Sequence, residues 1–162
     1  MYKRQELLIK RLRARTWAIT KLRRAGFSSQ EFVKFYCGAI RPVAEYAVPA
    51  FHSMILGHLS AALERQQVQA LKKHLGVGLS ARELRAKAGI ETLEKRREAS
   101  TLKFAEKTLK NPRFSSRWFP PRAGVWASRS GDLYLEKTSR TDRHSNSPIN
   151  YMIRQLNARP KM

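Results

Sequence analysis

Residues 5–24, QELLIKRLRARTWAITKLRR, decide the fold of the amino-terminal part of this chain. When the stretch is placed on a helix at about 100° per residue, four aliphatic side chains share one narrow stripe: Leu8, Leu12, Ile19 and Leu22. Gly26 follows the stretch, and glycine often ends a helix because it adopts the left-handed conformation without strain. The sequence therefore predicts an amphipathic helix over residues 5–24 that packs its apolar face on a core.

The opposite face of this helix carries the first group of candidate binding residues: Lys10, Arg13, Trp17, Lys21 and Arg24. Cations placed around an exposed aromatic ring are typical of surfaces that hold nucleic acid, since the cations contact phosphates and the ring stacks on bases or packs on sugars. The alternative interpretation is a solvated charged face, with Trp17 lying flat on a neighbouring helix.

Local signals then predict a second helix and its end. Ser28 and Glu31 have the spacing of a capping box, which predicts a helix beginning directly after Ser28. This helix is apolar nearly all round and is expected in the core. Pro42 has no N–H to donate, so we expect the helix to end or kink around residues 40–41 and a short segment to follow over 43–48.

A further helix over residues 60–75 carries the second group of candidate binding residues: Arg65, Lys72 and Lys73. Arg65 and Lys72 fall on the face opposite its apolar stripe. Two histidines precede this helix, His52 and His58, and they lie six residues apart. Because that spacing does not put both rings on one helical face, we interpret them as surface or capped histidines rather than metal ligands.

Two more helices complete the expected core. Ser80 and Glu83 form a second capping box, which predicts a short helix that ends at Gly89, and Thr92 is placed to cap a long helix over residues 93–110. Strand-like alternation is missing throughout this part of the sequence. The expected fold class is therefore all-α.

The expected architecture is a compact bundle of five or six helices over residues 5–110, followed by an irregular basic arm over residues 111–162. Beyond residue 111 the composition shifts to Pro, Ser, Arg and Gly without a helical period, which is typical of an extended segment rather than a second core. Ser147 and Pro148 are a plausible cap and first turn, so one short helix is expected over residues 149–156.

The charge balance indicates the class of partner. The chain has 162 residues, with 33 Lys and Arg against 12 Asp and Glu, a formal net charge of +21. The positive electrostatic field of such a chain favours the binding of a polyanion such as a nucleic acid. Each phosphate that the protein neutralises releases condensed counterions, which adds to the affinity. A merely soluble basic protein stays open as an alternative, and an anionic membrane surface is disfavoured because the cations are not confined to one amphipathic helix.

Two features of the sequence bear on the cellular compartment of the chain. A single cysteine, Cys37, indicates a reducing compartment, and we expect the nucleus or the cytoplasm. Residues 1–27 are rich in Arg and nearly free of acids, as in a mitochondrial presequence. That alternative is weakened because the stretch continues into the next helical signal without a break.

Other residue counts weigh against catalysis within this chain. One thiol cannot build a disulfide framework or a multi-cysteine zinc site, and no run of apolar residues is long enough to span a bilayer. The only aspartates are Asp132 and Asp142, whereas two-metal phosphoryl transfer needs several clustered carboxylates. We therefore expect no catalytic residue, no metal site and no cofactor.

The order of the segments resembles the region that follows the polymerase palm in non-LTR (LINE-type, jockey-like) retrotransposon reverse transcriptases. The segments that carry this resemblance are 17–28 (WAITKLRRAGFS), 35–36 (FY), 40–49 (IRPVAEYAVP), 63–71 (LERQQVQAL), 75–76 (LG), 88–98 (AGIETLEKRRE), 102–105 (LKFA), 111–112 (NP) and 140–148 (RTDRHSNSP). Each motif alone is weak, but together they cover nearly the whole chain in a matching order.

This resemblance implies a helical thumb with its carboxy-terminal extension, which grips a template–primer duplex beside the active site. The implied partners are an RNA–DNA hybrid, an RNA duplex or a DNA duplex, and the palm of a full-length relative. The palm's Asp-Asp motif is missing from this sequence, so the resemblance implies binding without catalysis. The alternative is a protein–protein interaction or homo-oligomerisation module derived from a retroelement fragment, whose apolar faces bind a partner or a second copy.

Overall fold

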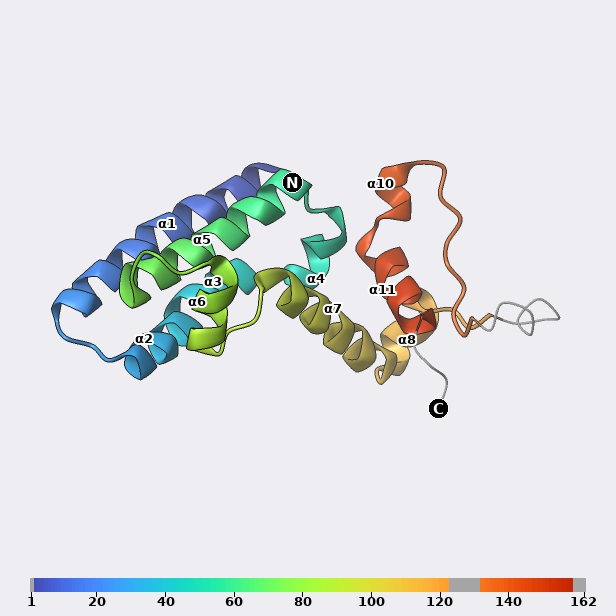
Figure 1. The fold of residues 1–162 in the computed structure, drawn as a ribbon. Helices are drawn as coiled ribbons and strands as arrows, with labels where there is room; N and C mark the ends of the chain where they lie inside the picture. The colour runs from blue at the N-terminus through green and yellow to red at the C-terminus, as the bar shows by residue number, and fades with distance from the viewer. Residues whose placement is uncertain (1, 123–131, 159–162) are drawn as a thin grey trace. The chain divides into compact units, whose positions relative to one another are not determined.

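The computed structural model describes residues 2–122 and 132–158, and its elements are helical (Figure 1). In chain order the elements are α1 (Tyr2–Arg24), α2 (Ser29–Phe35), a π-helical turn (Tyr36–Ile40), α3 (Arg41–Glu45), α4 (Val48–Phe51), a 3-10 turn (His52–Met54), α5 (Gly57–Leu75), α6 (Ala81–Ala88), α7 (Leu93–Leu109), α8 (Pro112–Trp118), α10 (Asp142–Ser145) and α11 (Pro148–Asn157). The β pairing seen among these residues is one isolated antiparallel bridge between Pro121 and Tyr134. The predicted all-α fold class is confirmed.

The chain folds as two compact units. The first unit comprises Met1–Tyr46 and Leu56–Arg96, and the second comprises Ala47–Ile55 and Arg97–Met162. The domain boundary expected at residue 110 therefore differs from the division that the structure shows. The difference arises because most of α7 packs with residues from the carboxyl-terminal part of the chain, which its sequence signature does not reveal.

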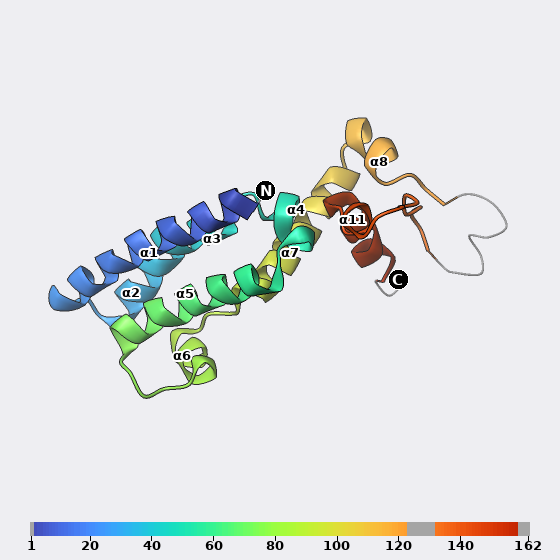
Figure 2. The ribbon, with the colours of Figure 1, turned by 90° about the horizontal axis from the view of Figure 1, so that it is seen from above.

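Packing of α1 on α5 builds the first unit. The two helices lie side by side in both views and run in the same direction (Figures 1 and 2). The predicted stripe of α1 is inward, with Leu8, Leu12 and Ile19 buried and Leu22 half-buried. On α5 the buried aliphatic side chains are Leu59, Leu63, Ala70 and Leu71. Full burial of each large aliphatic side chain contributes about 1.5–3 kcal/mol to folding.

Capping signals in the sequence correspond to hydrogen bonds in the structure. Gly26 has φ 79°, and the N–H groups of Gly26 and Phe27 donate to the carbonyls of Arg23 and Leu22 at 3.2 Å each. This pair of bonds is the Schellman arrangement that ends a helix at glycine. Both predicted capping boxes, Ser28 with Glu31 and Ser80 with Glu83, are confirmed.

Pro42 does not end the second helix, although an end or a kink is expected there from the sequence. The helical path continues from Ser29 to Glu45, but a π-helical turn over Tyr36–Ile40 precedes the proline. The wider turn accommodates a residue that has no N–H and whose ring crowds the preceding turn. The path then stops where Tyr46 is extended and Ala47 is left-handed (φ 56°). Because α3 and α4 are separate short helices, seven α-helices, α1 to α7, begin before residue 110 rather than five or six.

The second unit has a hydrophobic core of its own. Its buried members come from α7, α11 and the residue after α8: Ala105, Phe119, Met152, Ile153 and Leu156. Leu102, Leu109, Trp118, Tyr134 and Ile149 pack against this cluster. The expectation of an arm without a second core is therefore corrected for the described residues. Residues 123–131, which the expected arm includes, lie outside the described residues.

Two helices of this unit begin at polar caps followed by proline. Asn111 accepts a hydrogen bond from the Arg113 N–H at 3.0 Å and caps α8, a helix that the sequence analysis did not predict. Ser147 accepts from the Asn150 N–H at 3.4 Å and caps α11, which confirms the short helix expected over residues 149–156. Both helices carry proline in the first turn, where its missing N–H costs nothing.

Replacing Ile153 by alanine tests this second core. The Ile153 side chain is fully buried, so Ile153→Ala should lower the free energy of unfolding by about 2–5 kcal/mol. Leu135 is 47% exposed, and the matched variant Leu135→Ala should change it by less than about 0.5 kcal/mol. Chemical denaturation followed by helical circular dichroism measures both values. Equal effects of the two substitutions would contradict the assigned core.

Candidate nucleic-acid interface

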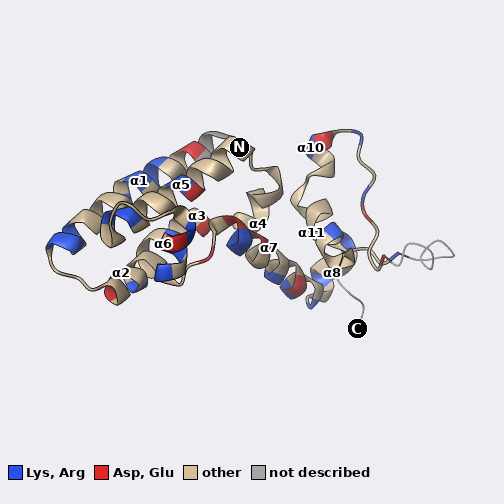
Figure 3. Ribbon diagram, in the orientation of Figure 1, with Lys and Arg blue, Asp and Glu red and all other residues tan. Residues whose placement is uncertain are grey.

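The outward face of α1 presents all of the candidate residues predicted for it. Lys10, Arg13, Trp17, Lys21 and Arg24 are exposed. Their positions span about 21 Å of helix axis and an arc of about 80°. Figure 3 shows Lys and Arg recurring along α1, whose acidic residue, Glu6, lies near the amino-terminal end. The helix therefore carries a continuous positive stripe.

Trp17 lies in the middle of this stripe and is 62% exposed. The Lys21 Nζ lies 5.0 Å from the centroid of the Trp17 ring, in a cation–π arrangement. The alternative interpretation, in which Trp17 lies flat on a neighbouring helix, is wrong because most of the side chain faces solvent. The exposed indole is therefore accessible to a ligand from solvent.

The parallel packing of α1 and α5 brings the carboxyl ends of the two helices together. Their last turns hold Lys21, Arg23 and Arg24 on α1 and Lys72, Lys73 and His74 on α5. Cations at these positions also stabilise the negative ends of the helix dipoles. The structure thus places the predicted Lys72 and Lys73 near the end of the α1 stripe. Arg65 is exposed on the same face as Lys72, about 10 Å nearer the amino end of α5.

Hydrogen bonds distinguish structural cations from those that remain available. Arg23 donates to the Lys73 carbonyl at 3.2 Å, and the Lys73 Nζ donates to the Thr16 carbonyl at 3.5 Å. Arg15 donates to the Ala39 carbonyl at 2.6 Å. These three side chains tie α1 to its neighbours. Of the candidates, Lys73 therefore has a structural contact in addition to any ligand.

Five of the seven carboxylates in the described part of the first unit are engaged by residues outside α1. Glu64 accepts from Arg85 at 2.9 Å and from the Glu94 N–H at 2.8 Å. Glu45 accepts from Arg96, and this pairing raises the pKa of the Arg96 guanidinium. Glu64 thus links α5 to both α6 and α7, and Glu45 links α3 to α7.

Three more carboxylates serve caps or local pairs. Glu31 and Glu83 complete the two capping boxes, and hydrogen bonds from the capping serines lower the pKa of each carboxyl. Glu91 pairs with Lys95 at 2.9 Å, which lowers the pKa of the Glu91 carboxyl. In the described part of the chain, Lys10, Arg13, Lys21 and Arg24 have no ion pair. No ion pair within that part therefore neutralises these four cations, although Glu6 lies one turn before Lys10 on the same face of α1.

His74 adds little to this charge at neutral pH. Its ring stacks on Phe32, with centroids 4.3 Å apart and planes 8° from parallel. Burial lowers the pKa of the imidazole, and repulsion by the Arg23 guanidinium lowers it further. The neutral form is favoured in the folded protein, so the cations near this end are lysines and arginines.

Gln67 is a structural polar residue that the sequence analysis missed. The side chain is 2% exposed, accepts from Arg85 Nε at 2.9 Å and donates to the Glu91 carbonyl at 3.0 Å. Gln67 also bonds to Tyr36, whose burial raises the pKa of the phenol to about 12. The available signal was its position on the inward stripe of α5, between Leu63 and Ala70.

A second set of exposed cations lies in the second unit and was not singled out from the sequence. These residues are Lys103, Lys107 and Lys110 in and just after α7, and Arg113 and Arg117 on α8. The signal that identifies them is spacing, because residues at i, i+4 and i+7 share one helical face. The two sets lie in different units of the chain.

Two other kinds of feature, a metal cluster and a membrane span, are missing from the described residues. In 2–122 and 132–158, no three His, Cys, Asp or Glu side chains gather closely enough to hold a metal ion. No helix in that part of the chain combines the length and apolar character that a membrane span requires. No family model, curated protein or solved structure matches the chain.

Proposed function

We propose that this chain is a nucleic-acid-binding helical module that grips the sugar–phosphate backbone with α1 and the carboxyl end of α5. One observation carries the proposal: the α1 stripe remains unneutralised while the neighbouring glutamates serve caps and interhelical pairs. Because these lysines and arginines are fixed on a helix and have no ion pair with a glutamate among the described residues, they favour the binding of a polyanionic ligand.

The mechanism of the proposed module is positioning. Lysine and arginine side chains contact phosphates, which fixes the register of a duplex without reading its bases. A stripe about 21 Å long runs past about a dozen phosphates of a duplex, which carries one charge per about 1.7 Å of axis. Lys10, Arg13, Lys21 and Arg24 therefore have enough phosphates within reach to bind any sequence. An RNA–DNA hybrid, an RNA duplex and a DNA duplex are all suitable ligands.

The more specific proposal is that the chain corresponds to the thumb and carboxy-terminal region of a non-LTR retrotransposon reverse transcriptase. Its support is the order of the motifs in the sequence, together with an all-α fold. Because Asp132 and Asp142 are the only aspartates, the proposed role includes no catalytic step within this chain. The proposal includes a nuclear or cytoplasmic location and a polymerase palm as a further partner.

Replacing Lys10, Arg13, Lys21 and Arg24 together by glutamine tests the binding role of the α1 stripe. Each phosphate contact contributes about 0.9 to the slope of log affinity against log salt on duplex DNA. The quadruple variant should therefore lower that slope by about three and weaken binding to all duplex sequences alike. Titration of a labelled DNA duplex at several salt concentrations measures the slope.

A matched control separates the stripe from net charge. Lys34, Arg82, Lys87 and Lys95 are exposed cations of the first unit that lie outside α1. Replacing these four by glutamine removes the same charge and should leave most of the slope in place. If both quadruple variants lower the salt slope equally, the chain binds the duplex through its overall positive charge, and the α1 stripe is not the interface.

The substitution Trp17→Ala tests whether the exposed indole stacks on bases. Stacking of one base on an aromatic ring contributes about 1–3 kcal/mol, so affinity for a single strand should fall by that amount with an unchanged salt slope. Because Trp17 is 62% exposed, the melting temperature should stay within about 2 °C of wild type. Unchanged single-strand affinity would show that the ring does not stack on bases.

A further inference from the structure

Three partly exposed aromatic rings lie together in the second unit. Phe104 is 39% exposed and Phe114 is 41% exposed. The ring centroid of Trp118 lies 6.5 Å from that of Phe104 and 5.5 Å from that of Phe114. Large aromatic side chains normally bury most of their surface. Together these rings form a partly exposed aromatic group on α7 and α8.

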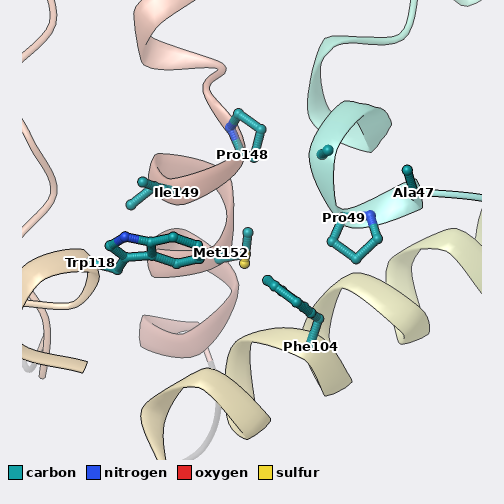
Figure 4. A pocket seen from close by; sticks show the side chains of 8 residues that line it. Ala47, Pro49, Phe104, Trp118, Pro148, Ile149 and Met152 are labelled. Atoms are coloured by element: carbon teal, nitrogen blue, oxygen red, sulfur yellow. The ribbon is translucent and has the colours of Figure 1, made fainter. Parts of the chain in front are cut away.

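Two of these rings line an apolar cavity of about 430 Å³. The side chains around it include Pro49, Phe104, Trp118, Pro148, Ile149 and Met152. Figure 4 shows Phe104 directed into the space from α7, with Trp118 and Ile149 on one side of it and Pro49 on the other. Among the described residues, no charged side chain lines the cavity. Its walls therefore suit a flat, weakly polar group rather than a phosphate or a sugar.

Exposed cations are interspersed with the aromatic residues along the same two helices. Lys103 directly precedes Phe104, and Arg117 directly precedes Trp118. Lys107, Lys110 and Arg113 continue the series, and all five cations are exposed. The carboxylates of this part of α7 are Glu98 and Glu106, so the surroundings keep a net positive charge. An apolar cavity lined from helices that also carry exposed cations suits a ligand that has a flat apolar part joined to anions.

We propose that this cavity receives an unstacked base of a single-stranded nucleic acid, while the cations of α7 and α8 hold the adjoining phosphates. The inference rests on the proposed function and assigns a second surface to it, for unpaired strands rather than duplexes. Every base has a π face, and base–aromatic stacking between cationic side chains is how proteins hold single strands without reading sequence. Because the lining supplies few hydrogen-bonding groups, binding should tolerate any base.

Charge argues against a second copy of this chain as the occupant of the cavity. Each copy has a formal net charge of +21, and α7 and α8 carry exposed cations. Two copies brought together would repel one another through these like charges, which costs free energy. A nucleic acid supplies both the flat group and the opposite charge.

The test compares two single strands of equal length that bind to the full chain at one salt concentration. One is an oligothymidylate, and the other has the same backbone with abasic sites in place of the bases. Both present the same phosphates, so any difference in affinity reports contacts with bases. The oligothymidylate should bind about five to a hundred times more tightly.

Two variants assign that difference to the cavity. Ala50→Leu adds a side chain at an exposed lining residue of α4 and fills the space without removing a core contact. Phe104→Leu keeps an apolar side chain but removes the stacking face. Each should reduce the ratio of the two affinities at least about fivefold. The matched control is Phe27→Leu, which changes an equally exposed ring (42%) in the first unit and should leave the ratio unchanged.

Specific outcomes overturn the inference. Equal affinity for the two strands, or an unchanged ratio in Ala50→Leu, would show that no base enters the cavity. If Ala50→Leu abolishes self-association in sedimentation while the ratio stays unchanged, the cavity is a protein contact. If the inference fails in one of these ways but the chain still binds a duplex through the α1 stripe, the proposed function stands. If the chain binds neither a duplex nor a single strand, the proposed function itself is contradicted.

Discussion

The parallel packing of α1 on α5 is the interaction on which the proposed interface depends. Burial of Leu12 and Ile19 fixes the rotation of α1, and that rotation directs its cations outward. The bonds from Arg23 to the Lys73 carbonyl and from Lys73 to the Thr16 carbonyl hold the two carboxyl ends together. If α1 turned about its axis by one position, the stripe would point elsewhere, because neighbouring residues on a helix differ by about 100°.

The distribution of carboxylates gives the first unit its electrostatic asymmetry. Glutamates that begin helices or link them, such as Glu31, Glu45 and Glu64, are held by serines, arginines and backbone N–H groups. These interactions stabilise the fold and also keep negative charge away from the outward face of α1. The same residues therefore contribute to folding and to the positive field that the proposed function requires.

Local signals predicted much of the fold, whereas contacts between distant residues escaped the sequence. Capping boxes and the end of α1 at Gly26 depend on residues within one helical turn, and the outward face of α1 follows from its periodicity alone. The second core joins Ala105, Phe119 and Ile153, which lie far apart in sequence and share no period. The approach of Lys72 to the end of α1, and the cavity beside Phe104, likewise require tertiary structure.

Amine-reactive footprinting with a bound RNA–DNA hybrid tests the central claim most directly, because it reports each lysine separately in the intact chain. Lys10, Lys21 and Lys72 lie on the proposed interface, whereas Lys34 and Lys87 are equally exposed lysines of the same unit outside it. The account predicts that the hybrid protects the first three from modification and leaves the other two reactive. Equal protection of all five, or protection of Lys34 and Lys87 alone, would contradict it.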